Sequence, residues 1–363
     1  MSSSHIKGRG AQHHTANKFL EHHQELRDDF LNHCTLEGVA AQSNKTTFIS
    51  TFPKTIVNKV TSPDIGMGYS LNPYQGCEHG CVYCYARNSH EYWGYNAGLD
   101  FEQKILVKKN APELLEKHLQ KKNWAPNTIV LSGNTDCYQP IEKKLKITRE
   151  LLKVFLKYKH PVGIITKNAL IQRDIDILEE LAKDNLIHVS ISITSLEEST
   201  RRILEPRTAS IKKRLETVDV LTKIGVPVNV MMAPIIPAIN SHEILPLVEE
   251  VSRRGAVSVG YTIVRLNGSI GEVFTEWIKK TMPDRAEKVL HQIAACHGGT
   301  LNDSQYGRRI KGEGNIAEQI HQQFAIARKK FLPADPWEPL NTSLYAEAKR
   351  LNLNTSTGQM RLF

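Results

Sequence analysis

Three cysteines in one short loop are the residues of this chain best suited to chemistry. Cys77, Cys81 and Cys84 are spaced C-x3-C-x2-C, with Gly76 and Gly80 beside them. Glycine accepts backbone conformations that other residues avoid, so the loop can fold back and bring three sulfurs toward one centre. Thiolates are soft ligands that select iron–sulfur clusters, zinc or copper(I). A closed zinc site and a fully ligated cubane each need four ligands, so three cysteines leave one metal position open for chemistry.

The sequence around these cysteines resembles a known enzyme family. An aromatic residue, Tyr83, precedes the third cysteine, as in the signature of the radical S-adenosylmethionine (SAM) superfamily. Residues 72–87 (NPYQGCEHGCVYCYAR) and 135–142 (TDCYQPIE) are similar to the branch related to spore photoproduct lyase, often described as DNA repair photolyase-like. The resemblance covers roughly residues 45–330. It identifies no substrate, because one fold hosts many chemistries.

The resemblance implies two cofactors, a [4Fe–4S] cluster and SAM. The three thiolates would hold three irons, the fourth iron would chelate the amino and carboxylate groups of SAM, and Tyr83 would lie beside the cofactors. One electron, from a donor such as flavodoxin or ferredoxin, would split SAM into methionine and a 5′-deoxyadenosyl radical. The alternative is a zinc loop with a distant fourth ligand.

Residues at the ends of the expected strands are candidates for holding SAM. Radical SAM enzymes commonly bind the SAM ammonium with a Gly-Gly-Glu-like turn, but this chain has Ser-Gly-Asn-Thr-Asp at 132–136. Oxygens of Asn134, Thr135 and Asp136 are the expected acceptors, although Asp136 could instead cap the next segment. Lys167 resembles a lysine that contacts the SAM carboxylate in this branch, and a solvated lysine is the alternative.

Four further positions complete the predicted site. Ser192, in an otherwise apolar strand, is expected at the SAM ribose, unless neighbouring backbone satisfies its hydroxyl. Arg207 is a candidate for the SAM carboxylate or a substrate phosphate, and an ion pair between Glu205 and an arginine is the plainer alternative. Tyr85 resembles a tyrosine that spore photoproduct lyase uses near its cluster. Cys137 is a candidate hydrogen-atom donor, because that enzyme uses a cysteine from a loop in this region, and an inert buried thiol is the alternative.

Beyond the cysteine loop, apolar strands alternate with amphipathic helices. Strands are expected at 69–72, 104–108, 128–132, 161–166, 187–194, 227–233 and 257–264. Continuously apolar strands separated by helices indicate a parallel sheet whose outer face is covered by helices. The fold class is therefore α/β, a partial (β/α)6-type radical-SAM barrel whose active site lies at the carboxyl ends of the strands.

The chain divides into four regions by composition. Residues 1–44 are a polar, His-rich arm with a helix near 17–31, residues 45–268 form the barrel, 269–331 are a helical C-terminal extension, and 332–363 are a flexible tail. The arm carries His13, His14, His22 and His23. Their spacing matches no recognised ligand pattern, so a solvated arm is expected in preference to an auxiliary metal site.

The net charge indicates which partners to expect, and the cysteine pattern indicates the cellular compartment. Lysine and arginine number 47 against 38 acidic residues, and such an excess favours nucleic acid. No apolar run is long enough to cross a membrane, and the N-terminus has no secretory signal. Three scattered cysteines beside one tight loop of three indicate the reducing cytoplasm. Candidate nucleic-acid contacts are Arg201, Arg202, Arg308, Arg309 and Lys311.

Together these features predict a cytoplasmic radical SAM enzyme that acts on DNA in a repair-like role. The alternatives are radical modification of a protein or small molecule and, as a non-enzyme, a zinc-stabilised nucleic-acid-binding protein. The last five residues, Gln359, Met360, Arg361, Leu362 and Phe363, resemble the Gln-Leu-x-Leu-Phe peptide by which bacterial repair proteins bind the sliding clamp. An apolar terminus packed on its own domain is the alternative.

Overall fold

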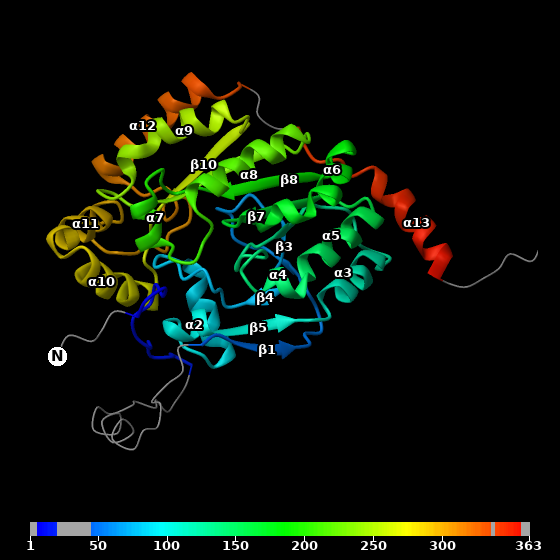
Figure 1. The fold of residues 1–363 in the computed structure, drawn as a ribbon, viewed down its shortest axis with the longest axis horizontal. Helices are drawn as coiled ribbons and strands as arrows, with labels where there is room; N and C mark the ends of the chain where they lie inside the picture. The colour runs from blue at the N-terminus through cyan, green and yellow to red at the C-terminus, as the bar shows by residue number, and fades with distance from the viewer. Residues whose placement is uncertain (1–5, 20–44, 335–337, 357–363) are drawn as a thin grey trace, which may run out of the picture.

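A curved sheet with six parallel strands forms the centre of the molecule (Figure 1). The computed structural model describes residues 6–19, 45–334 and 338–356. The strand order is β10-β9-β8-β7-β6-β3-β2, and β2 (Val57–Lys59) is antiparallel to its neighbour. The parallel strands are β3 (Tyr69–Leu71), β6 (Ile129–Leu131), β7 (Val162–Thr166), β8 (Ile187–Ser192), β9 (Val228–Ile235) and β10 (Ser258–Ile263). Six parallel strands in sequence order confirm the predicted partial (β/α)6 barrel.

Helices cover the outer face of this sheet (Figure 1). They are α3 (Ala111–Gln120), α4 (Glu142–Leu145), α5 (Ile147–Lys157), α6 (Ile175–Lys183), α7 (Glu198–Leu204), α8 (Ile211–Lys223) and α9 (Ile244–Arg253), with short 3-10 turns η2 (Ala169–Asp174) and η3 (Ser241–Glu243). In α5 the apolar residues Ile147, Leu151, Leu152 and Phe155 recur at helical spacing and are buried. That spacing puts them on the face that meets the sheet, so the alternation read from the sequence builds the main hydrophobic core.

The strand at 104–108 was placed in the barrel by the sequence pattern, and this was wrong. It is β5 (Lys104–Lys108), the middle of a separate three-stranded sheet with β1 (Thr47–Thr51) and β4 (Tyr74–Gln75). Between β4 and β5 lie η1 (Tyr85–Trp93) and α2 (Leu99–Gln103). Because an apolar strand looks the same in either sheet, only pairing with β1 and β4 decides its place. The small sheet fixes the chain immediately before the cysteine loop.

Two of the three C-terminal helices share a core with the cysteine loop. The C-terminal helices are α10 (Ser269–Thr281), α11 (Pro283–Ala295) and α12 (Gly314–Phe331). Phe274 and Trp277 of α10 belong to one buried cluster with Cys81, Val82 and Tyr83. Helices α10 and α11 therefore pack against the loop, whereas α12 contributes its buried residues to the main core.

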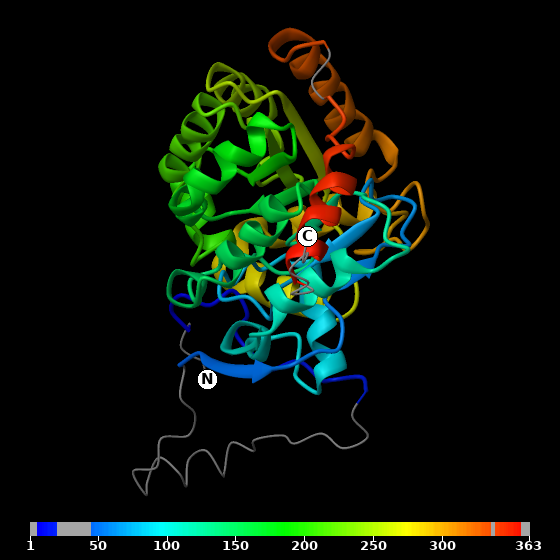
Figure 2. The same cartoon turned by 90° about the vertical axis from the view of Figure 1, so that its right-hand side faces the viewer.

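The tail contains a helix that the sequence reading did not expect. Helix α13 (Leu344–Ser356) lies along the outside of the barrel (Figure 2), where Tyr345 donates to the carbonyl of Leu119 and Lys349 donates to that of Lys121 at 2.6 Å. The proposed clamp-binding peptide, residues 359–363, lies outside the described residues.

The N-terminal arm also differs from the solvated segment that was expected. Arg9, Ala11, Thr15 and Asn17 are buried against the rest of the protein. The expected helix lies almost wholly beyond the described residues, as do His22 and His23. In the part of the chain that the structure describes, no helix has the length and apolar character needed to cross a bilayer.

Candidate functional site

The cysteine loop lies at the carboxyl end of β3, as the barrel prediction requires. Gly76 and Gly80 have φ of 82° and 68°, in the left-handed region that favours glycine. A Cβ at Gly76 would lie 2.9 Å from the carbonyl oxygen of Lys104, and one at Gly80 would lie 2.8 Å from a carboxylate oxygen of Glu102. The two glycines thus let the loop turn tightly against α2 and β5.

Side chains from other barrel segments hold the loop in place. The Gln139 side chain accepts from the Glu78 backbone N–H and donates to the Gly76 carbonyl, both at 3.1 Å. Glu78 in turn accepts from the Ile141 backbone N–H at 3.0 Å and from Arg207 at 3.2 Å. These bonds couple the loop to the segment after β6 and to the segment after α7.

The three thiols of the loop fit a cubane cluster by their chemistry. Burial raises the pKa of Cys77, Cys81 and Cys84, and the charge of Lys167 opposes this at Cys81 and Cys84. Metal coordination replaces the thiol proton and removes that penalty. Within the described residues no three His, Cys, Asp or Glu side chains converge on a single metal ion. In a cubane each cysteine takes a different iron, so the three thiols need not converge.

The turn at 132–136 lies beside the loop, but its side chains have protein partners. The backbone N–H groups of Asn134 and Thr135 donate to the Asn72 side chain, at 2.8 and 3.3 Å. The Asn134 amide donates to Gln75, and the Thr135 hydroxyl donates to the Tyr74 carbonyl. Ser132 has φ of 71°, an uncommon conformation for a non-glycine residue that marks a constrained turn. The turn is fixed against the start of the cysteine loop.

Asp136 joins the cysteine loop to the end of β7. It accepts from the Thr166 hydroxyl and from the Lys167 backbone N–H, both at 2.8 Å. It also lies 3.4 Å from His79, a buried imidazole whose pKa burial lowers to about 4. Asp136 also accepts from the Tyr138 backbone N–H at 2.8 Å, so it caps the segment that follows it, which is the alternative raised from the sequence.

Glu205 is the residue that sequence reasoning undervalued. Its carboxylate is fully buried and accepts hydrogen bonds from Tyr83, from Thr194 at 2.9 Å and from Arg214 at 2.6 Å. Burial alone would raise the pKa of Glu205, but Arg214, Lys167 and Tyr83 together lower it to about 2. The sequence predicts an ion pair between Glu205 and an arginine, and the structure shows that this arginine is Arg214 on α8.

Lys167 lies between this carboxylate and the cysteine loop. Its Nζ is 3.7 Å from Glu205 and 5.9 Å from the centre of the Tyr83 ring. Its side chain remains 17% exposed, so the ammonium is held in place and still reachable. Contact of Lys167 with the SAM carboxylate stays a prediction.

The two predicted catalytic residues differ in accessibility. Tyr85 is 57% exposed, and its hydroxyl donates to the Gly133 carbonyl at 2.6 Å. Cys137 is fully buried in the main hydrophobic core, where its backbone N–H donates to Ser132 and its carbonyl accepts from Thr148. Burial of the thiol in that core favours the alternative of an inert thiol, and the donor role of Cys137 stays a prediction.

Ser192 and Arg207 complete the predicted set. Ser192 is 5% exposed, and its carbonyl accepts from Arg214 at 2.9 Å. Arg207 is one-third exposed, and its guanidinium bonds Glu78 in the cysteine loop. Arg207 thus helps to fasten the loop, with part of its surface free for a ligand.

A row of polar side chains crosses the inner face of the barrel. On β8 and β9 the side chains of Val189, Val228 and Val230 belong to the main hydrophobic core beneath the helices. Successive side chains of a strand point to opposite faces, so Ser190 and Asn229 face the inside of the barrel. Asn229 donates to Ser190 at 3.1 Å and accepts from Ser258 at 2.7 Å. Both serines keep partial exposure, Ser190 on β8 inside the sheet and Ser258 on the edge strand β10. The inner face of the barrel therefore carries hydrogen-bonding groups on three adjacent strands.

The basic residues proposed to contact nucleic acid are largely paired within the protein. Arg201 is buried, bonded to Glu198 and to backbone carbonyls, so it cannot serve as a surface contact. Arg308 pairs with Asp303, and Arg309 pairs with Asp64 at 2.6 Å. Arg202 and Lys311 are exposed, and Arg202 lies 3.4 Å from Glu198.

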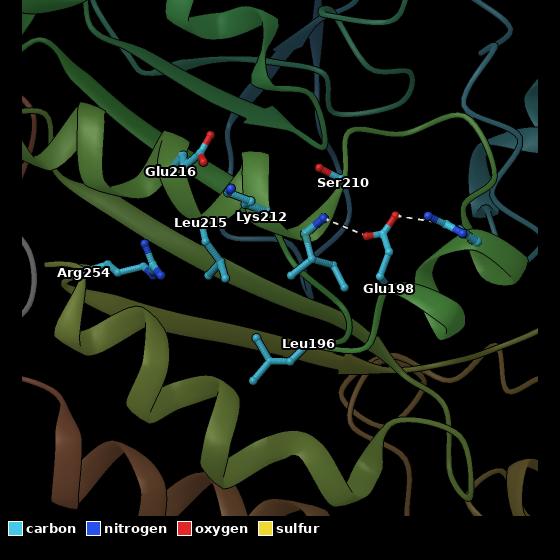
Figure 3. Close-up of a pocket in the computed structure, with 9 residues that line it drawn as sticks. Leu196, Glu198, Ser210, Lys212, Leu215, Glu216 and Arg254 are labelled. Atoms are coloured by element: carbon cyan, nitrogen blue, oxygen red, sulfur yellow. Dashed lines mark hydrogen bonds and ion pairs between the residues drawn. The ribbon is translucent and has the colours of Figure 1, made fainter.

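A cavity of about 550 Å³ lies between α7, α8 and α9 (Figure 3). Glu198 lines it and accepts from the backbone N–H of Ile211 at 3.1 Å, so the N-terminus of α8 already has a carboxylate partner. No residue of the cysteine loop lines this cavity. The active site is therefore assigned to the carboxyl ends of the strands and not to this groove.

Comparison with known proteins agrees with the geometry. The Radical SAM superfamily model matches residues 71–251, from β3 to α9. The chain belongs to this superfamily, and it is an enzyme that uses a [4Fe–4S] cluster and SAM. This excludes the zinc-binding alternatives.

Several relatives share this domain. An uncharacterized protein of Mycobacterium tuberculosis is 29% identical over 248 residues, which cover 68% of this chain and 73% of the relative. An uncharacterized protein of Methanocaldococcus jannaschii is 28% identical over 230 residues, covering 63% and 82%. Their names indicate no substrate.

The fold is similar to that of spore photoproduct lyase. The lyase complexed with dinucleoside spore photoproduct has a TM-score of 0.60 at 16% identity, covering 80% of this chain and 81% of the lyase. A mutant lyase with bound AdoMet and the same dinucleoside has a TM-score of 0.60 at 15% identity, covering 84% and 92%. At these identities the similarity establishes the architecture.

Proposed function

We propose that this radical SAM enzyme acts on nucleic acid in a repair-like reaction within the reducing cytoplasm. The observation that carries the proposal is the row Ser190–Asn229–Ser258 on the inner face of the barrel. These side chains offer hydrogen bonds that a polar substrate can use and an apolar substrate cannot. The edges of nucleobases carry donors and acceptors that such side chains recognise. Support also comes from the shared architecture with a lyase solved with a dinucleoside lesion, and from the excess of nine basic residues.

In this proposal Cys77, Cys81 and Cys84 are the cluster ligands, and the remaining residues position SAM. When bound and reduced by a donor such as flavodoxin or ferredoxin, the cluster supplies the electron that cleaves SAM to methionine and a 5′-deoxyadenosyl radical. Lys167, oriented by Glu205, binds the SAM carboxylate as a point charge. Tyr83, within the loop and beside the cofactors, ties the loop to the end of α7 through its bond to Glu205.

The other predicted contacts take modified roles. Asn134, Thr135 and Asp136 shape the turn after β6, whose carbonyls and Asn134 side-chain oxygen face the ammonium. Ser192 lies close to the ribose, Arg207 holds the loop and contacts an anionic ligand with its exposed part, and Tyr85 exchanges a hydrogen atom at the mouth of the barrel.

The test is substrate-stimulated cleavage of SAM. Anaerobically reconstituted protein would be incubated with dithionite and SAM, and 5′-deoxyadenosine would be measured with ultraviolet-irradiated DNA, undamaged DNA, RNA and cell extract. We expect irradiated DNA to stimulate cleavage most, and the Cys84→Ala variant to give none. Stimulation by protein or metabolite fractions of the extract, but not by nucleic acid, would assign the enzyme to one of the alternative substrate classes.

Salt dependence provides an independent check of the substrate class. Because released counterions drive nucleic-acid binding, affinity for DNA should fall steeply as salt rises. The exposed Arg202 and Lys311 are the contacts retained from the sequence prediction, and their substitution by Gln should reduce the salt slope. DNA binding that is absent at low salt argues against the proposal.

The C-terminal peptide of residues 359–363 remains a proposed sliding-clamp ligand. In this proposal Gln359 hydrogen-bonds at the edge of the clamp groove, and Leu362 and Phe363 fill its apolar pocket, because a few buried side chains carry the affinity of short peptides. A peptide of residues 355–363 should bind a bacterial clamp in calorimetry. Replacing Leu362 and Phe363 by Ala should abolish that binding.

A further inference from the structure

We propose that residues 6–17, here called the N-terminal strap, form part of the iron–sulfur site by covering the back of the cysteine loop. The sequence predicts that these residues belong to a solvated arm. In the structure the strap instead lies between α2 and α10 (Figure 1, dark blue), and Arg9 is only 7% exposed. The proposal concerns the stability of the cofactor and is independent of the substrate.

The strap connects to the cysteine loop through one buried carboxylate. Both oxygens of Glu102 are used, accepting from the backbone N–H of Gly10 at 3.1 Å and from that of Ala11 at 2.8 Å. Glu102 also pairs with Arg87 at 2.5 Å, and both side chains are fully buried. Arg87 donates two bonds, at 3.0 and 2.9 Å, to the carbonyl of Cys81. A continuous hydrogen-bonded path thus joins the strap to a proposed cluster ligand.

The strap also touches the loop backbone directly. A Cβ at Gly10 would lie 1.8 Å from the carbonyl oxygen of Gly80 and 2.9 Å from its carbonyl carbon. No side chain fits in that space, so glycine is required at position 10 for the strap to seat. Gly80 lies immediately before Cys81, and its left-handed conformation is part of the turn that presents the sulfur.

Further hydrogen bonds join the strap to η1, to the segment between η1 and α2, to α2 and to α10. Thr15 accepts from the Ala97 backbone N–H and His13 accepts through its carbonyl from Leu99, both at 3.1 Å. Asn17 donates to two carbonyls of the segment after the loop, at 3.0 Å each. On the other side, His13 bonds Glu272 of α10 at 2.8 Å. The strap is therefore anchored along its length, and not only at Gly10.

The packing separates the strap from the barrel core. Ala11 forms a small apolar cluster with Leu99, Val273 and the partly buried Ile6, and no strap residue belongs to the main barrel core. Displacing the strap should therefore leave the barrel folded while it exposes the backbone behind Cys81 to water. Residues around metal ligands control ligand orientation and solvent access.

The experiment compares Gly10→Ala with a glycine that has open space around it. Gly66→Ala is the matched control, because a Cβ there meets nothing within 4 Å. After anaerobic reconstitution, iron and sulfide content, the electron paramagnetic resonance signal of the reduced cluster, and the rate at which its visible absorption bleaches in air would be measured. We expect Gly10→Ala to bleach about tenfold faster, with an altered resonance signal, whereas Gly66→Ala matches the wild type.

A second variant keeps the proposal falsifiable if Gly10→Ala does not fold. Thr15→Val is nearly isosteric and removes only the acceptor for Ala97, far along the strap from the cysteines. We expect it to bleach faster than wild type by a smaller factor, with unchanged far-ultraviolet circular dichroism. Wild-type iron content and bleaching rates in whichever of the two variants fold would overturn the proposal.

Discussion

The barrel core and the surroundings of the cysteine loop are built in different ways. In the barrel core, most strands pack on helices near them in the sequence, as β8 does with α6 and α8 and β9 does with α8, and α12 is the late addition that packs on β10. Around the cysteine loop, the packing residues come from the strap, from α2, from the segment that holds Glu205, and from α10 and α11. The comparison teaches that the scaffold folds from local pattern, whereas the cofactor site depends on contacts between distant segments.

The largest expected effect comes from the cysteines themselves. Replacing Cys77, Cys81 or Cys84 by Ala should abolish cluster assembly and SAM cleavage, because the loop has no spare ligand. The barrel core contains none of these residues, so the circular dichroism of the apoprotein should match the wild type. Iron analysis and 5′-deoxyadenosine measurement test this. A triple variant that still cleaves SAM would refute the assignment of the site.

Glu205→Gln should affect both the barrel and the cysteine loop, because this carboxylate accepts hydrogen bonds from Arg214 on α8 and from Tyr83 in the loop. Removing its charge leaves the buried Arg214 unpaired, which we expect to lower the free energy of unfolding by about 3–5 kcal/mol and also to reduce cluster content. Urea denaturation of the apoprotein measures the first effect.

The control for Glu205→Gln is Glu150→Gln, which removes an exposed pair with Lys153. A change of no more than about 1 kcal/mol is expected there. Equal changes in the free energy of unfolding would show that the buried Glu205 network stabilises the protein no more than an exposed ion pair does.

Acid should lower the free energy of unfolding of the barrel, because His160 is buried in the neutral form. Burial lowers the pKa of His160 to about 4, against an ordinary value of 6.5. The unfolded chain therefore binds the proton first, and stability present above pH 6.5 is lost as the pH falls toward 4. We expect a loss of about 1–3 kcal/mol from this residue across that interval. Urea midpoints measured against pH should fall less steeply in His160→Gln, and parallel curves would contradict the prediction.

The smallest expected effect comes from removing one methyl group in each of the two cores, and it compares the two regions directly. Ile164→Val in the barrel core and Ile270→Val in the core beneath the cysteine loop remove one methyl group from side chains that are equally buried. Each should lower the free energy of unfolding by about 0.5–1.5 kcal/mol. Only Ile270→Val should also speed the loss of iron in air. Equal iron retention would mean that packing beneath the loop does not reach the cluster.

The sequence by itself determined the barrel and the position of the cysteine loop. Apolar strands alternating with amphipathic helices such as 147–157 carry their own periodicity, so six strands and their helices could be predicted without knowledge of distant contacts. The spacing of Cys77, Cys81 and Cys84 likewise lies within a few residues.

Only the tertiary structure decided which segments surround that loop. The strand at 104–108 joins a separate sheet, residues 6–17 pack behind the cysteines, and the tail forms a helix on the barrel wall. The same holds for single residues: Glu205 pairs with Arg214 from α8, Asp136 binds the end of β7, and Cys137 is enclosed in the core. Such contacts follow from pairing and burial over long sequence separations, which neither residue type nor periodicity records.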